Sequence, residues 1–293
     1  MHNGVVLKKK KNYRPGSFPY IWSRMTKNSG AMIGLGLIVL LLVMCFISPL
    51  VLTADYSTIN MKLAYSLPSA EHIFGCDELG RDILARVLFG ARYTLLIGVG
   101  STAFAAIIGV LLGAIAGYFG GFVDSLIMRC MDVLQSFPGI VSAIAVATVL
   151  GTGLFNSIIA IGIAFIPAFV RLMRANVMSI RGSEFIEASV SLSASTPRIL
   201  FKHLIPNAIS PIIVQISLSI AQGGLTASTL SFLGLGVKDP MPEWGAMISS
   251  ARNYIRQAPH MVIIPGLFIM MTLISLNLIG DALRDALDPK LRD

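Results

Sequence analysis

Residues 187–207 read EASVSLSASTPRILFKHLIPN, a short segment of charged and hydroxyl side chains between two long apolar runs. From Glu184 to Leu192 acids alternate with apolar residues, which predicts a short amphipathic helix whose N-terminal acids complement the helix dipole. Ser195-Thr196-Pro197 then predicts an N-cap followed by proline at the first helical position. A second helix over Arg198–Leu204 is expected to stop before Pro206. Such a helix-turn-helix would project from the surface and could dock in a groove of a partner protein. The alternative interpretation is a linker with interfacial helices.

The composition identifies an all-α polytopic membrane protein. Hydrophobic residues make up 55% of the chain and charged residues only 13%, against roughly a quarter charged in ordinary soluble domains. A helix needs about 20 apolar residues to cross a bilayer. Six transmembrane helices are predicted, and their approximate bounds are Gly30–Leu52, Tyr93–Gly117, Ile127–Leu150, Ile158–Leu172, Ala208–Phe232 and Met261–Ile279.

The distribution of the net charge of +8 predicts the orientation of these helices. Residues 1–29 carry seven basic side chains and no acid, so this tail is expected in the cytoplasm. Six crossings then place the basic loop 171–206 and the C-terminal tail 281–293 inside as well. Because the excess positive charge follows this topology, it gives no indication of nucleic-acid binding.

The spacing of the spans divides the chain into a first helix and a core. Residues 30–52 form the first span, and residues 53–92 form an extracytoplasmic segment that ends in an interfacial helix, with Asp77 as a plausible N-cap and Asp82–Arg86 as an i,i+4 pair. Residues 93–280 form a core of five spans, which contains the inner loop 176–206. The apolar face of that interfacial helix comprises Ile83, Leu84, Val87, Leu88 and Ala91. A second outer segment, Trp244–Ile255, has helical spacing and is interpreted either as a cap over a translocation mouth or as an interfacial helix.

Two further patterns in the spans have structural and functional interpretations. Gly109, Gly113 and Gly117 repeat every four residues, which lets another helix approach closely, and packing within the bundle is favoured over a subunit contact. Arg129 and Asp132 can pair at i,i+3 near the cytoplasmic end of the third span. A structural ion pair is the favoured role, and a cytoplasmic gate is the alternative.

Residues for catalysis are scarce. The four histidines lie far apart and never at metal-ligand spacing with cysteine or acid, so no metal site is expected in this chain. No phosphate-binding G-x-x-x-x-G-K-[ST] loop occurs, so we expect no cofactor and no enzymatic activity. An intramembrane protease would need Ser101 as its nucleophile, but no span offers a histidine at depth as its base.

Several separated motifs resemble one family. Glu187-Ala188-Ser189, Ser193 and the ending Ile205-Pro206-Asn207 resemble the EAA loop of ABC-importer permeases, whose pattern is Glu-Ala-Ala, three residues and Gly, with an apolar-Pro ending. More narrowly, four segments resemble the C-type permease subunit of dipeptide, oligopeptide and nickel importers: FGCDELGRD at 74–82, SFLGLG at 231–236, EWG at 243–245 and NLIGDALRD at 277–285. The resemblance covers the chain from about residue 20 onward.

This resemblance implies a type I ABC importer permease fold with a cytoplasmic coupling helix. The partners it implies are a second homologous permease subunit, two ABC ATPases that use ATP and Mg, an extracytoplasmic substrate-binding protein and membrane lipid. The residues expected at the ATPase contact are Glu184, Glu187, Ala188, Ser189, Ser193 and Arg198. Ser193 departs from the family's glycine, and a left-handed conformation there costs a non-glycine residue roughly 1 kcal/mol, which could reshape the turn.

The expected function is to form half of a translocation pathway for di- or oligopeptides in a bacterial plasma membrane. A nickel or metal-chelate importer of the same family is the alternative cargo assignment. A stand-alone channel or secondary transporter is the alternative from another class, and the lack of acids in the middle of the spans argues against it. Both termini are expected in the cytoplasm.

Overall fold

A computed structural model describes residues 18–51 and 55–287, and the expectations for residues 1–17, 52–54 and 288–293 lie outside the described part. Its regular elements in this part are helices, apart from an isolated bridge between Cys76 and Asp82. Their order is α1 (Phe18–Met25), α2 (Ser29–Val51), η1 (Met61–Leu63), α3 (Ile83–Phe119), α4 (Gly121–Gln135), α5 (Gly139–Leu150), α6 (Leu154–Ile180), α7 (Glu184–Ser191), α8 (Thr196–Arg198), η2 (Ile199–Leu204), α9 (Ile205–Ala208), α10 (Ser210–Phe232), α11 (Trp244–Ala251), η3 (Arg252–Tyr254) and α12 (His260–Leu287).

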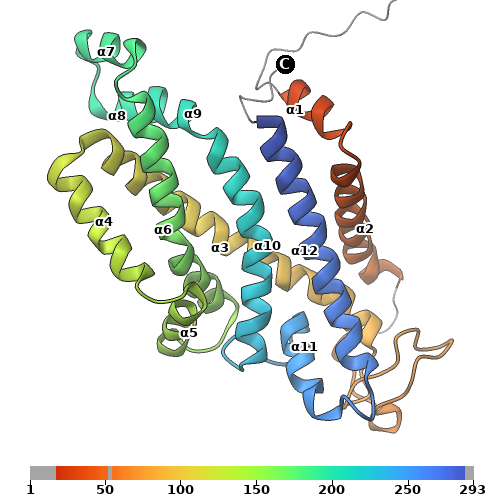
Figure 1. Cartoon of the computed structure of the whole chain (residues 1–293). Helices are drawn as coiled ribbons and strands as arrows, with labels where there is room; N and C mark the ends of the chain where they lie inside the picture. Colours follow the sequence, from red (N-terminus) through yellow and green to blue (C-terminus); the bar gives the residue numbers. More distant parts are fainter. Residues whose placement is uncertain (1–17, 52–54, 288–293) are drawn as a thin grey trace, which may run out of the picture.

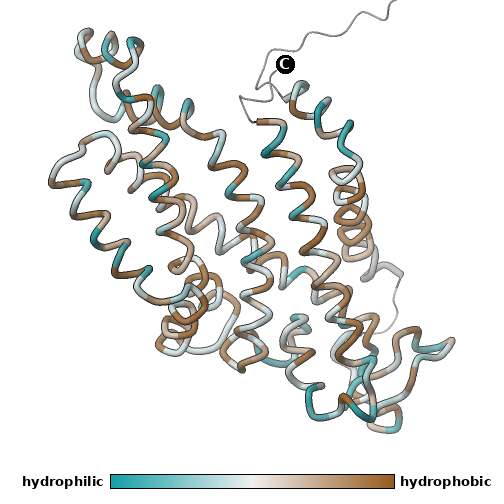
Figure 2. Tube along the Cα trace, viewed as in Figure 1, coloured by the Kyte–Doolittle hydropathy of each residue, from teal (hydrophilic) through white to brown (hydrophobic). Residues whose placement is uncertain are grey.

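The long helices lie side by side in a bundle. In Figure 1, α12 lies between α2 and α10, α4 lies at the opposite edge from α2, and α3 runs obliquely behind the others. Brown, apolar residues dominate the long helices in Figure 2, while the ends of the bundle carry more teal. Within the described residues five helices are long and apolar enough to cross a membrane: α2, α3, α6, α10 and α12.

The predicted third span, Ile127–Leu150, is not one straight helix. It consists of α4 and α5, which meet at an angle of 87°, so the pair is either a broken sixth span or a re-entrant segment. Pro138 stands at the N-cap of α5 in an extended conformation (φ −52°, ψ 138°). Because proline has no N–H to donate and its ring clashes with the preceding turn, a helix ends before it.

The predicted interfacial helix and the second span are a single helix of 37 residues, α3. The expected boundary near Tyr93 is therefore wrong. Asp82, rather than Asp77, caps this helix, because its carboxylate accepts a hydrogen bond of 2.9 Å from the Ala85 amide. Arg86 forms its ion pairs with Asp77 and Asp239 instead of with Asp82.

The glycine repeat of α3 packs against α6, which confirms the expectation of close packing within the bundle. A Cβ added at Gly113 would lie 2.5 Å from the carbonyl oxygen of Val170, and one at Gly109 would collide with the Cβ of Phe169. Only glycine allows the two backbones to approach this closely. The α3–α6 contact is the most extensive helix pair in the fold.

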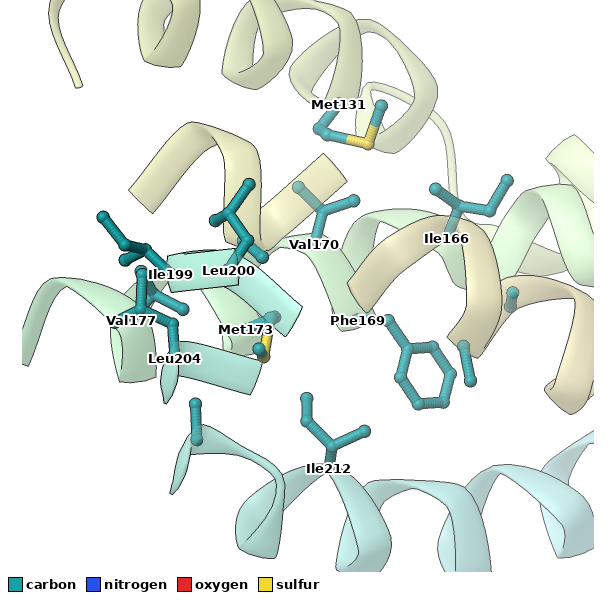
Figure 3. Close-up of a cluster of buried hydrophobic side chains, with 14 of the residues drawn as sticks. Met131, Ile166, Phe169, Val170, Met173, Val177, Ile199, Leu200, Leu204 and Ile212 are labelled. Atoms are coloured by element: carbon teal, nitrogen blue, oxygen red, sulfur yellow. The ribbon is translucent and has the colours of Figure 1, made fainter. Parts of the chain in front are cut away.

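A buried apolar cluster joins this helix pair to the loop that follows α6. Figure 3 shows side chains of α6, of η2 and of α10 meeting in it, with Met131 of α4 at its margin. The labelled members are Met131, Ile166, Phe169, Val170, Met173, Val177, Ile199, Leu200, Leu204 and Ile212. The cluster therefore packs the loop directly against α6 and α10.

Candidate functional site

The candidate site is the α7 loop, which we define as residues 181–208. α7 forms as predicted, with Ser183 at the N-cap in an extended conformation (φ −79°, ψ 150°). The Ser183 carbonyl accepts backbone bonds from Ile186 (2.9 Å) and Glu187 (3.1 Å). Glu184 and Glu187 occupy the first turn, where negative charge is stabilised by the helix dipole.

The end of α7 is a Schellman turn centred on Ser193. The Ala194 amide donates to the Ser189 carbonyl at 3.1 Å, and the Ser193 amide donates to the Val190 carbonyl at 2.8 Å. Ser193 has φ +55°, the left-handed conformation that favours glycine. The turn therefore keeps the geometry of a glycine turn although the residue is serine, and the expected reshaping does not occur.

The second helix of the loop differs from the prediction. Ser195 is the N-cap residue of α8 as expected, but Pro197 is the second helical residue rather than the first. The chain then forms a π-helical turn, η2, and continues through Pro206 into α9 instead of stopping before it. In the π turn the Ile205 amide donates to the Leu200 carbonyl, five residues back. This i→i−5 hydrogen bond stands just before Pro206, which has no N–H to donate to the carbonyl four residues back.

One apolar side chain ties α7 to the bundle. Along α7, all of which the structure describes, Ile186 alone is buried, at 2% exposure. It belongs to the apolar cluster of Figure 3 together with Ile199, Leu200 and Leu204. The rest of α7 projects from one end of the bundle (Figure 1). We call that end of the bundle, which carries the α7 loop, the α7 end.

The residues predicted to make the partner contact lie on the surface. Glu184, Glu187, Ala188, Ser193 and Arg198 are exposed, whereas Ser189 is half-buried and donates its hydroxyl to the Phe185 carbonyl at 2.7 Å. Large apolar side chains are exposed beside them: Leu192 at 85%, with Val190 and Phe185 about half exposed. Exposed apolar groups rimmed by charge are typical of a protein-protein contact surface.

Arg174 of α6 and Arg181, the C-cap residue of α6, fix the base of the loop. The Arg181 guanidinium donates to the Gly117 carbonyl at 3.0 Å, satisfying an orphan carbonyl at the end of α3. Arg174 binds Asp124 of α4 through two parallel hydrogen bonds, of which Nη2–Oδ2 measures 2.6 Å. Such a bidentate pair fixes geometry as well as adding energy.

The predicted pairing of Arg129 with Asp132 is replaced by another ion pair. Asp132 binds Arg171 of α6 at 2.7 Å, and both side chains are about half exposed or more. Arg129 is exposed on α4. The pair therefore connects α4 to α6 rather than two turns of one helix, and no local spacing could predict it because its partners are 39 positions apart in the chain.

A second charged cluster, at the opposite end of the bundle, was missed by sequence reasoning. Arg81 and Arg86 are 3% and 2% exposed. Asp239 joins them, with its Oδ1 lying 3.2 Å from Arg81 and 3.1 Å from Arg86. Asp77 binds the Arg81 Nε at 2.6 Å. We call these four residues the arginine cluster; it attaches the segment before α3 to the loop before α11.

Other buried groups at this end are structural. Glu243 caps α11 through the Ala246 amide (2.9 Å) and accepts bonds from Thr94 and Ser228. Trp244 is fully buried and donates its indole N–H to the Val87 carbonyl at 2.8 Å, so α11 is packed into the bundle and Trp244 does not belong to a lipid-facing belt. Burial raises the pKa of the Cys76 thiol to about 11.

The described residues offer little for catalysis. In this part of the chain no group of three or more His, Cys, Asp or Glu side chains could hold a metal ion. Ser101, the candidate protease nucleophile, is buried and donates to the Gly98 carbonyl at 3.2 Å. What the geometry provides instead is an anchored, exposed loop on a membrane bundle.

Comparison with known proteins agrees with this arrangement. Residues 109–293 match the family "Binding-protein-dependent transport system inner membrane component", and residues 18–68 match "N-terminal TM domain of oligopeptide transport permease C". A dipeptide transport system permease protein of Alkalihalophilus pseudofirmus is 44% identical, covering 92% of this chain and 89% of that protein. A di/tripeptide transport system permease of Pseudomonas aeruginosa is 42% identical over 100% of this chain and 98% of that protein. A glutathione transport system permease of Pectobacterium atrosepticum is 46% identical over 81% of this chain and 77% of that protein.

The fold also matches a solved structure. A chain of the MetNI methionine ABC transporter in an inward-facing conformation superposes with a TM-score of 0.55 and 17% identity, covering 69% of this chain and 96% of that chain. At that identity the match shows the fold alone, which is that of an ABC importer permease. The length and identity of the sequence matches are what show the family: this chain belongs to the binding-protein-dependent transport system inner membrane components, within the C-type permease subunits of peptide ABC importers.

Proposed function

We propose that this chain forms half of the translocation pathway of an ATP-driven importer for di- or oligopeptides. A second homologous permease completes the pathway, two ABC ATPases bind the α7 end, and an extracytoplasmic binding protein delivers the peptide to the opposite end. The α7 end then faces the cytoplasm, as do both termini. The observation that supports this most directly is the exposed α7 loop, tied by Ile186 to a cluster that reaches α6 and α10.

The proposed coupling is mechanical. ATP-driven closure of the two ATPases moves α7, and the close-packed cluster passes that movement to α6 and α10. We assign the ATPase contact to Glu187, Ala188 and Ser193, flanked by Glu184 and Arg198. Coupling requires that the ATPases and the binding protein each prefer one state of an inward-facing and outward-facing equilibrium.

Peptides are the proposed cargo because the relatives that span most of this chain are named for dipeptide, di/tripeptide and glutathione transport. Glutathione is itself a tripeptide, so these names share one chemistry. The chain contributes the membrane pathway and contributes no ATP site of its own to this scheme.

The test uses the complete importer in proteoliposomes with its binding protein. We expect Glu187→Arg to insert and assemble normally, to abolish peptide-stimulated ATP hydrolysis and to abolish uptake, because it reverses the charge and adds bulk at the proposed contact. Lys27→Glu, an exposed charge reversal between α1 and α2 and outside the α7 loop, is the matched control and should leave coupling intact. Normal coupling in Glu187→Arg would reject the proposed ATPase contact, and peptide flux through this chain alone would favour a channel.

A further inference from the structure

A cavity of about 630 Å³ lies between α6, α10 and α12 toward the α7 end. It is separate from the exposed surface of α7. Its walls are Leu172, Asn176, Ser179 and Ile180 of α6, Asn207 and Ala208 of α9, Ser210, Pro211, Val214, Gln215 and Leu218 of α10, and Arg284 and Leu287 of α12. Volumes of roughly 300–1,000 Å³ are typical of pockets for small ligands.

Two hydrogen-bond donors in this cavity are uncommitted. Asn176 lines the cavity, and its Nδ2 atom is itself buried and has no hydrogen-bond partner within the described residues, so it reaches a ligand when the side-chain amide rotates toward the cavity. Arg284 is exposed at the end of α12, and no acid of the described part lies in ion-pair contact with it. A buried amide without a partner is destabilising, so a ligand that accepts its hydrogen bond is favoured.

The other polar groups are already engaged as donors but have acceptors to offer. Asn207 donates its Nδ2 to the His203 carbonyl at 2.6 Å, and Gln215 donates its Nε2 to the Ser219 hydroxyl at 3.1 Å. Their side-chain carbonyl oxygens therefore remain for N–H groups of a ligand. Ser179 donates its hydroxyl to the Asn176 backbone carbonyl at 2.7 Å.

The positive charge of Arg284 makes the cavity complementary to an anionic ligand. Arg284 is the one ionisable group among its described lining residues, and a guanidinium matches the two oxygens of a carboxylate bidentately. Leu172, Val214 and Leu218 add an apolar wall. The complementary ligand thus has a carboxylate, amide N–H groups and apolar side chains.

We propose that this cavity is an inner peptide site, in which Arg284 and the Asn176 amide bind the C-terminal carboxylate of a di- or tripeptide before its release. This proposal rests on the proposed function, which makes the α7 end cytoplasmic. A phosphatidylglycerol headgroup shares the anionic chemistry, but its donors are two hydroxyl groups rather than the amino and amide N–H groups that a peptide offers to the side-chain carbonyls of Asn207 and Gln215. The peptide therefore fits more of the site.

The experiment compares two ligands that differ in one charge. The complete importer, with its second permease and both ATPases, is held in phosphatidylcholine nanodiscs without ATP or binding protein. Equilibrium binding is measured with radiolabelled alanyl-leucine and with its C-terminal amide. We expect the wild type to prefer the free carboxylate and Arg284→Gln to bind it about 10-fold or more weakly, as expected for loss of a hydrogen bond to a charged group. Asn176→Leu should also weaken binding of the free carboxylate.

The C-terminal amide should bind Arg284→Gln and the wild type equally, which separates charge recognition from damage to the fold. Arg256→Gln, at the other end of the bundle, is the matched control. Equal preference for the carboxylate in Arg284→Gln, or no saturable binding by the wild type at millimolar peptide, would overturn the proposal.

A second arm tests for a lipid. Displacement of the dipeptide by phosphatidylglycerol from the wild type alone would assign the site to a lipid headgroup and overturn the peptide site. Failure of this inference is distinguishable from failure of the proposed function. In the first case Arg284→Gln binds as the wild type does while Glu187→Arg still uncouples ATP hydrolysis; in the second case Glu187→Arg couples normally.

Discussion

Replacing Ser193 by glycine should stabilise the turn that ends α7. Ser193 has φ +55°, and its amide and that of Ala194 close the Schellman turn. A non-glycine residue in the left-handed region costs about 1–2 kcal/mol. Glycine offsets part of the gain, because its larger freedom in the unfolded chain costs roughly 0.5–1 kcal/mol. The midpoints of these two ranges differ by about 0.75 kcal/mol in favour of glycine, which is a factor of about 3–4, or 2–5 with its spread, in the local opening equilibrium.

Amide hydrogen exchange measures this opening directly. The Ser193 and Ala194 amides of Ser193→Gly should exchange about 2–5 times more slowly than those of the wild type. Ser193→Val should have the opposite effect, because a β-branched side chain fits poorly at positive φ. Ser195→Gly is the matched control: Ser195 has φ −64°, where glycine relieves no strain and only adds freedom to the unfolded chain. Unchanged or faster exchange in Ser193→Gly would refute the account of a strained turn.

Three more predictions concern packing, thiol chemistry and the arginine cluster. Gly113→Ala should lower the melting temperature of the purified protein, since its Cβ would lie 2.5 Å from a carbonyl oxygen of α6, whereas Gly36→Ala, with nothing within 4 Å of the new Cβ, should not. An equal effect of both would contradict the close α3–α6 approach. Cys76 should resist a water-soluble maleimide at pH 8 until the protein is denatured, because with a pKa of about 11 only about one thiol in a thousand is ionised; rapid labelling would show that the site opens. Asp239→Asn should accelerate proteolysis of the loop before α11, because it removes the charge that binds two buried arginines; unchanged proteolysis would mean that the arginine cluster does not hold this loop.

The features that the sequence could predict are those that depend on the spacing of residues close together in the chain. Hydropathy located five of the long helices, and the alternation after Glu184 located α7. The glycine repeat predicted close packing, and its partner proved to be α6. The family's glycine position predicted that a left-handed turn would be strained at Ser193. Each of these depends on residues within one or two helical turns, where sequence periodicity carries the information.

The features that sequence could not predict depend on residues far apart in the chain. The second span was expected to begin near Tyr93, but α3 begins at Ile83, and Arg86 near its start pairs with Asp239, 153 residues later. Asp132 was expected to pair with Arg129, three residues away, but it forms an ion pair with Arg171 of α6. The direction of the chain after Pro138 depends on how α5 packs against α6, and proline only requires that the helix end there.

The continuity of α3 has a mechanical consequence. The helix begins beside the arginine cluster at one end of the bundle, and its last turn is bound by Arg181 at the base of the α7 loop. Its 37 residues measure about 55 Å at 1.5 Å per residue. A rod of that length tilted by about 5° displaces one end relative to the other by about 5 Å. Because α3 is one continuous helix, a tilt that displaces its end at the arginine cluster also displaces its end at the base of the α7 loop, and the reverse holds as well.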